Sequence, residues 1–191
     1  KDLVDTDRQG DGGFWRTALR LLDALPREIA SRFAALFLFI APEPEDSARL
    51  LEEAMTRLRQ PRAVIDGAAL LVRHALDTEK PGDPGLTLYR QGIEKGLSLL
   101  RFRLALARAR HGDASKQAEQ AQSLLDKALR LVSEGACLCL KDLTVKGEDL
   151  LALGVPPDGR MAKALDHLMR KVLAGEAENS REALLREAGR L

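Results

Sequence analysis

Residues 143–191 read LTVKGEDLLALGVPPDGRMAKALDHLMRKVLAGEAENSREALLREAGRL, and this stretch decides the fold class. After Gly159, apolar residues recur every three or four positions, which places Met161, Leu165, Leu168 and Val172 on one face of a helix. The segment 175–179 breaks this pattern, and a second amphipathic segment follows it. The stretch therefore predicts a tail of short helices that share one apolar core.

The composition extends this prediction to the whole chain. Of the 191 residues, 45% are hydrophobic but only 4% are aromatic, and Leu, Ala, Arg and Glu dominate. Because these are helix formers and β-branched residues are scarce, we expect an all-α protein, a multi-helix bundle of about eight helices with a C-terminal tail subdomain of short helices. We place the boundary between two regions after residue 112, giving a helical body (1–112) and a helical tail (113–191).

Breaks in the periodicity divide the body into helices. Proline at position 26 separates the first two, Asp46 or Ser47 can cap the third, and Pro61 suits the first position of the fourth. Residues 77–85 contain two prolines and two glycines and predict a surface loop. The expected helices before the tail are 14–25, 27–40, about 47–58, 61–75, 86–110 and 115–133.

The order of parts in the last fifty residues resembles the C-terminal segment of bacterial class II tRNA nucleotidyltransferases, of the CCA-adding and poly(A) polymerase type. The matching positions are Val145-x-Gly147-x-Asp149-Leu150-Leu151, Leu153-Gly154-x-Pro156-x-x-Gly159, Leu165-x-x-Leu168-x-x-x-Val172-x-x-Gly175, and Asn179 with Glu182-Ala183-Leu184-Leu185. The resemblance implies a part that handles tRNA and performs no chemistry. Residues 33–76 are loosely similar to the metal-dependent phosphohydrolase region of relatives, but apolar residues 37–41 stand where its His-Asp dyad would be.

In the family that the tail resembles, a separate N-terminal head binds Mg²⁺ and transfers nucleotides from ATP or CTP to RNA 3′ ends. The only comparable pair here, Asp5 and Asp7, follows no glycine-rich turn and lies in no apolar strand. The chain also begins at Lys1 without an initiator methionine, which indicates a fragment whose catalytic head is missing. We therefore expect no catalytic residue and no cofactor in residues 1–191, whereas the parent enzyme would use Mg²⁺ with ATP or CTP.

Two sets of basic residues are candidates for contact with an RNA backbone. Residues 56–112 hold 11 Lys and Arg against 5 Asp and Glu, so positive charge gathers in the middle of the chain. The sharper set lies opposite the apolar face of the tail helix, beside a helix start whose unpaired N–H groups suit a phosphate. Both sets could instead be ordinary solvated faces. The tail set comprises Arg160, Lys163, His167 and Arg170, and the second set comprises Arg101, Arg103, Arg108 and Arg110.

Other kinds of site have little support. The three histidines, at 74, 111 and 167, have no ligand partners at metal-binding spacing, so we expect no metal site. Only two cysteines occur, at 137 and 139, which favours a reduced, cytoplasmic setting. The longest apolar stretch, 33–41, is too short to cross a bilayer.

The leading hypothesis for the function of the chain is a non-catalytic part that binds tRNA or another structured RNA by shape. The alternative is a helical protein-interaction or scaffold module that has lost RNA binding.

Overall fold

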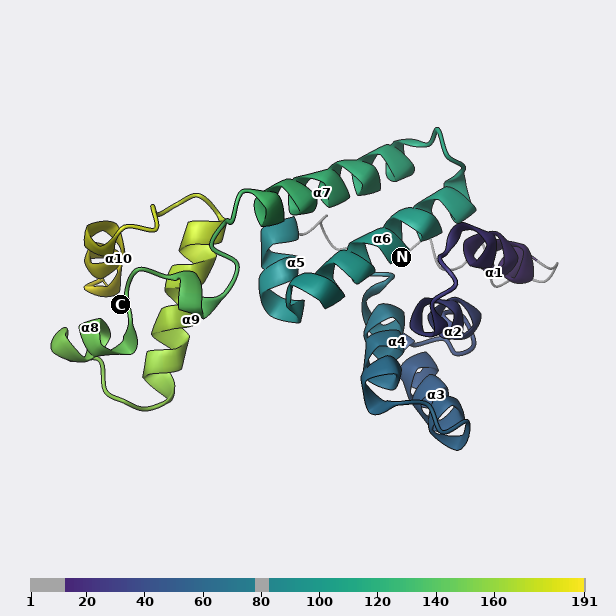
Figure 1. Ribbon diagram of the computed structural model, residues 1–191, viewed down its shortest axis with the longest axis horizontal. Helices are drawn as coiled ribbons and strands as arrows, with labels where there is room; N and C mark the ends of the chain where they lie inside the picture. The colour runs from purple at the N-terminus through teal and green to yellow at the C-terminus, as the bar shows by residue number, and fades with distance from the viewer. Residues whose placement is uncertain (1–12, 78–82, 191) are drawn as a thin grey trace. The chain divides into compact units, whose positions relative to one another are not determined.

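The computed structural model describes residues 13–77 and 83–190, which form ten α-helices, one 3-10 helix and no strand (Figure 1). The all-α prediction is confirmed. The elements are α1 (Gly13–Ala24), α2 (Ile29–Phe37), α3 (Pro44–Arg57), α4 (Arg62–His74), α5 (Pro84–Gln91), α6 (Ile93–His111), α7 (Lys116–Ser133), η1 (Leu140–Asp142), α8 (Gly147–Ala152), α9 (Gly159–Leu173) and α10 (Arg181–Ala188).

The single long helix expected over 86–110 was wrong. Helix α5 ends at Gln91 and α6 begins at Ile93, because Gly92 between them has φ +81°. A left-handed residue cannot continue a right-handed helix, and glycine adopts that conformation without the penalty that a Cβ brings. Buried residues of α6, among them Leu100, Phe102 and Ala105, lie on several of its faces.

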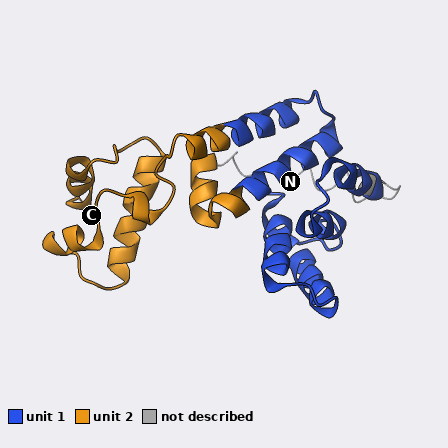
Figure 2. Ribbon diagram, viewed as in Figure 1, with its two compact units in different colours: residues 1–81, 97–126 blue, residues 82–96, 127–191 orange. Residues whose placement is uncertain are grey.

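The described residues form two compact units (Figure 2). Unit 1 contains 13–77 and 97–126, and unit 2 contains 83–96 and 127–190. This grouping differs from the predicted boundary after residue 112, because the contacts assign 113–126 to unit 1 and 83–96 to unit 2. As a division between two functional regions, the predicted boundary remains a prediction.

Unit 1 is built on the packing of α2 and α3 against α4. Its core holds fully buried side chains such as Leu51 and Met55 of α3, with Phe102 of α6. The apolar residues where relatives carry a His-Asp dyad take part in this core, since Leu38 is buried and Phe37 and Phe39 pack against it. This segment therefore contributes packing to unit 1.

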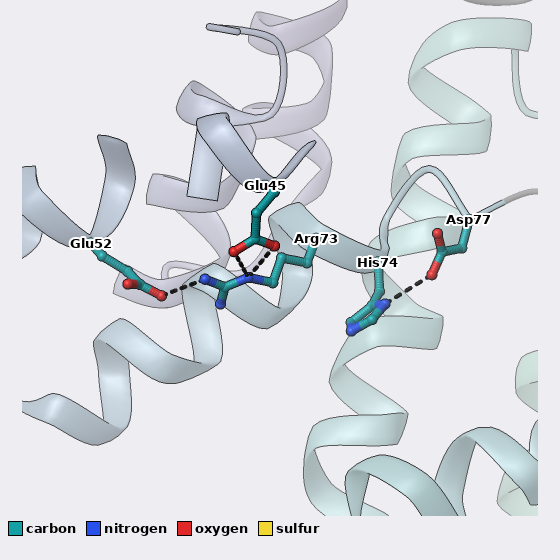
Figure 3. Close-up of polar contacts among 5 residues, drawn as sticks. All are labelled: Glu45, Glu52, Arg73, His74 and Asp77. Carbon is teal, nitrogen blue, oxygen red and sulfur yellow. Dashed lines mark hydrogen bonds and ion pairs between the residues drawn. The ribbon is translucent and has the colours of Figure 1, made fainter. Parts of the chain in front are cut away.

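A polar network ties the helices of unit 1 together at their surface (Figure 3). The Nε atom of Arg73 on α4 lies 2.9 Å from Glu45 Oε2 and its Nη2 atom 2.9 Å from Glu52 Oε1, both on α3. The hydrogen bond from Arg73 lowers the pKa of the Glu45 carboxyl. The adjacent His74 pairs with Asp77 at 2.8 Å. One arginine thus bridges two acidic residues of the neighbouring helix, and we interpret the network as structural.

Unit 2 contains the tail, and several of the positions that carry the resemblance are core or cap positions, whereas Leu151 and Leu153 are exposed. Val145, Leu150 and Leu184 are fully buried. Asp149 accepts a hydrogen bond from the backbone N–H of Lys146 at 2.8 Å, which caps α8, and it also pairs with Arg181. These contacts join α8 to α10 around one core. The tail of short helices predicted from the sequence is confirmed.

Asn179 fastens the segment between η1 and α8. Its side-chain oxygen accepts from the Thr144 backbone N–H at 3.0 Å, and its amide donates to the Asp142 carbonyl at 2.9 Å. At the other end of α8, Gly154 with φ +88° donates to the Leu151 carbonyl and ends the helix. The tail positions that carry the family resemblance therefore help to determine the fold of unit 2.

Candidate nucleic-acid interface

Helix α9 presents its apolar face to the core of unit 2 and its basic face to solvent. Leu168 and Met169 are fully buried, while Met161, Leu165 and Val172 pack against the same core. The predicted core face is thus confirmed. Because a helix repeats every 3.6 residues, the four predicted basic residues fall on the opposite side. Of these, Arg160, Lys163 and Arg170 are exposed and His167 is half-buried.

The start of α9 differs from the expectation of unpaired N–H groups. The Asp158 carboxylate accepts the backbone N–H of Arg160 at 2.7 Å, and the N–H of Met161 donates to the Asp158 carbonyl at 3.0 Å. That expectation was therefore wrong for these two donors, because the carboxylate and the backbone carbonyl of Asp158 already accept them. The Arg160 guanidinium binds the same carboxylate, with Nη2 at 3.0 Å, and these hydrogen bonds lower the pKa of Asp158.

The four basic residues differ in their partners. Arg160 pairs with Asp158, and Arg170 pairs with Asp166 at 2.7 Å. Lys163 makes no hydrogen bond or ion pair with any residue that the structure describes. Exposed ion pairs contribute about 0–1 kcal/mol, so an incoming phosphate can compete for both arginines. The face can therefore offer three cations to a polyanion, with the His167 imidazole beside them.

Arg170 is held in place by a chain of contacts that the sequence did not reveal. The Tyr89 hydroxyl of α5 donates to Asp166 Oδ1 at 3.0 Å, and Arg170 Nε donates to Asp166 Oδ2 at 2.7 Å. Burial raises the pKa of Asp166, but the hydrogen bonds from Arg170 and Tyr89 outweigh this effect and keep its pKa below the ordinary value. Asp166, which in the sequence only dilutes the positive charge, thus orients Arg170.

The buried hydrogen bond of Tyr89 can be observed directly, because this is the only tyrosine in the chain. Burial, together with the hydrogen bond to Asp166, raises the pKa of its phenol above 10.0. The contribution of this group to stability is therefore present below about pH 10 and lost as the pH rises through the higher folded-state pKa. A titration followed by phenolate absorbance should give a midpoint above 10, and Asp166→Ala should return it part of the way. An unchanged midpoint in the variant would contradict the contact.

A cavity of about 360 Å³ lies in unit 2 between the start of α5 and the end of α9. It adjoins the basic face, because His167 and Arg170 belong to both. The lining residues are Asp83, Leu86, His167, Arg170, Lys171, Leu173, Ala174 and Glu176. No pattern in the sequence predicts this cavity, because its walls come from two segments about eighty positions apart.

The second predicted set, on α6, is largely engaged with the protein. Arg103 donates two hydrogen bonds to the His74 carbonyl, at 2.7 and 3.1 Å, and burial lowers the pKa of its guanidinium. The Arg110 guanidinium lies 4.8 Å from the ring centre of Phe39. Arg108 bonds to Gln122 at 3.1 Å, and Arg101 is exposed. RNA contact by these four residues remains a prediction, and the contacts of Arg103 and Arg110 favour packing roles.

No cluster that could hold a metal ion occurs within 13–77 and 83–190. Asp5 and Asp7 lie outside the described residues. Cys139 is exposed, whereas Cys137 is half-buried with its Sγ 3.6 Å from Met169 Sδ, and burial raises the pKa of the Cys137 thiol to about 11. Among the helices described, none is long and apolar enough to span a membrane.

Comparison with known proteins gives one match. The sequence model of a family described as "tRNA nucleotidyltransferase domain 2 putative" matches residues 27–188, which is most of the chain and includes both units. Neither the curated proteins nor the solved structures contain a significant match. The family match covers the α9 face, the cavity and all of the tail positions that carry the resemblance.

Proposed function

The chain belongs to the tRNA nucleotidyltransferase domain 2 family, and from this premise we propose that it is a non-catalytic part that binds tRNA or another structured RNA through the basic face of α9. The observation that carries the proposal is the position of Arg160, Lys163, His167 and Arg170 on one side of a helix whose other side is the core. Such a surface offers several cations to a sugar-phosphate backbone while the fold keeps them in register.

Recognition on this face is by backbone and shape. Lysine and arginine contacts to phosphates position an RNA without reading its sequence, and a folded tRNA presents phosphates at fixed spacings. Nucleotidyl transfer, with its Mg²⁺ and ATP or CTP, belongs in this proposal to a separate catalytic head, so that the helical part holds the RNA away from the reacting end. Whether the product is a CCA end or a poly(A) tail would be decided in that head.

We propose that the protein acts in the cytoplasm. Two free cysteines are consistent with a reducing compartment, where disulfides are rare. No step of the proposal runs through a metal ion on the described residues, since they bring no set of suitable ligands together.

Charge reversal at Lys163 tests the proposal. Lys163→Glu should lower the affinity for tRNA about tenfold and reduce the steepness of its salt dependence by about one unit, because one phosphate contact is replaced by a repulsion. Lys163 is exposed and makes no hydrogen bond or ion pair with another described residue, so the fold should be unaffected. Filter binding with purified tRNA measures the change.

The matched control is Lys95→Glu. Lys95 is an exposed lysine in unit 2 on α6 and not on α9, and its reversal changes the net charge by the same amount. We expect its affinity to stay within about twofold of the unmodified chain. Equal losses in the two variants would show that only overall charge matters, and would contradict an interface on α9.

A further inference from the structure

The cavity beside the basic face combines an apolar wall with a polar rim. Leu86 of α5, Leu173 of α9 and the following Ala174 supply the apolar wall. Three basic and two acidic side chains make up the rim. Its volume of about 360 Å³ falls at the lower end of the range of about 300–1,000 Å³ that is usual for small-ligand sites. The size and lining therefore suit one small, partly apolar group.

The charges around the cavity nearly cancel. Lys171 pairs with Glu176 at 2.6 Å, and Asp83 pairs with Lys127 at 3.5 Å while also capping α5. Counting Arg170 and Lys171 against Asp83 and Glu176, two positive charges meet two negative ones when His167 is neutral. A phosphate gains little inside such a site, whereas a neutral ring with hydrogen-bonding edges can meet both donors and acceptors there.

Arg170 links the cavity to the basic face. Its Nε atom is held by Asp166, which is itself held by Tyr89, so the guanidinium plane has a fixed orientation at the rim. No hydrogen bond to its terminal nitrogens occurs among the residues described. Bases of unpaired nucleotides stack on arginine planes as well as on aromatic rings. An arginine held in this way provides a stacking surface in a cavity whose described lining contains no aromatic side chain.

Resting on the proposed RNA binding, we propose that this cavity accepts the base of one unpaired nucleotide of the bound RNA. The base would lie against Leu86 and Leu173 with the Arg170 plane beside it. The phosphates on either side of that nucleotide would then lie on the basic face of α9. The preferred ligand is thus a structured RNA with an extruded or single-stranded nucleotide, and not a fully paired helix.

Two RNA hairpins test this inference. One is fully paired, and the other carries a single-nucleotide bulge in the same stem. The unmodified chain should bind the bulged hairpin about tenfold more tightly, because only the bulge can place a base in the cavity. Ala174→Phe should remove that preference while changing the affinity for the paired hairpin by less than about twofold, since it fills the cavity without altering charge.

The matched control is Ala162→Phe, since Ala162 is an exposed residue of α9 that does not line the cavity, and this variant should keep the preference. Far-UV circular dichroism checks that both variants fold. If the unmodified chain binds both hairpins equally, the inference is overturned while the proposed RNA binding stands. If neither hairpin binds, the proposed function itself fails. Adenosine monophosphate competing as strongly as the bulged hairpin would assign the cavity to a free nucleotide and overturn the RNA assignment.

Discussion

Replacing Gly96 by valine is expected to lower the free energy of unfolding by about 3 kcal/mol. A Cβ at this position would lie 2.9 Å from Leu88 Cδ2 and 3.1 Å from Leu88 Cα. Leu88 is fully buried in α5, so its backbone cannot move away without opening the packing of α5 against α6. Overpacking of this kind costs about 1–3 kcal/mol, and contact with backbone atoms places the cost at the upper end.

Urea denaturation followed by far-UV circular dichroism measures this effect. The matched control is Gly159→Val at the start of α9, where a Cβ meets no atom within 4 Å and φ is not in the left-handed region. This variant should change the free energy of unfolding by less than about 0.5 kcal/mol. If both variants lose the same stability, the close approach of α5 to α6 is not what Gly96 provides.

The paired glycines at 92 and 96 show what the sequence can and cannot predict. Gly96 lets α5 approach α6 closely, since a Cβ there would lie 2.9 Å from Leu88 Cδ2. Gly92 adopts φ +81° and separates these two helices. Helix propensity alone predicts one continuous helix. The conformation of a glycine inside a periodic pattern, and hence whether the helix ends there, cannot be predicted from the pattern.

The tail was the most predictable part of the fold. Apolar periodicity identified the core face of α9, and all four predicted residues are buried or packed on the core. Several positions of the tail motif are structural. Asp149 caps α8 and Asn179 fastens the preceding segment, which explains why these residue types are needed there. The motif therefore identifies the family through the architecture of unit 2.

The candidate site was predictable only in part. The spacing of Arg160, Lys163, His167 and Arg170 reveals a shared face, because helix geometry follows from local sequence. The helix start was misjudged, since a capping aspartate occupies donors that could otherwise meet a phosphate. The contact of Tyr89 with Asp166 spans 77 residues, and no local pattern can report it. Long-range contacts of this kind require the folded structure.

The largest effect that we expect is the loss of RNA affinity with salt. Each phosphate contact contributes about 0.7–0.9 to the slope of log affinity against log salt concentration, because binding releases condensed counterions. With Arg160, Lys163 and Arg170 of α9 engaged, raising the salt from about 50 to about 200 mM should weaken binding about 20- to 40-fold. Arg160 must leave Asp158 to reach the full effect, and an exposed pair is weak enough for this to occur, whereas Arg170 can keep its Nε on Asp166 and offer its terminal nitrogens.

If the two arginines stayed with their aspartate partners and made no phosphate contact, only Lys163 would act and the loss would fall to about threefold. The slope of the salt dependence therefore reports the number of phosphate contacts, in addition to showing that binding occurs. It also separates the RNA hypothesis from a protein-interaction module, because contacts between largely apolar surfaces depend far less on salt.

The measurement that tests the central claim most directly is a filter-binding titration of the unmodified 191-residue chain with purified tRNA at these two salt concentrations. The account predicts measurable binding at the lower concentration and a loss of about 20- to 40-fold at the higher one. An absence of binding at both concentrations, or an affinity that changes by less than about twofold between them, would contradict it.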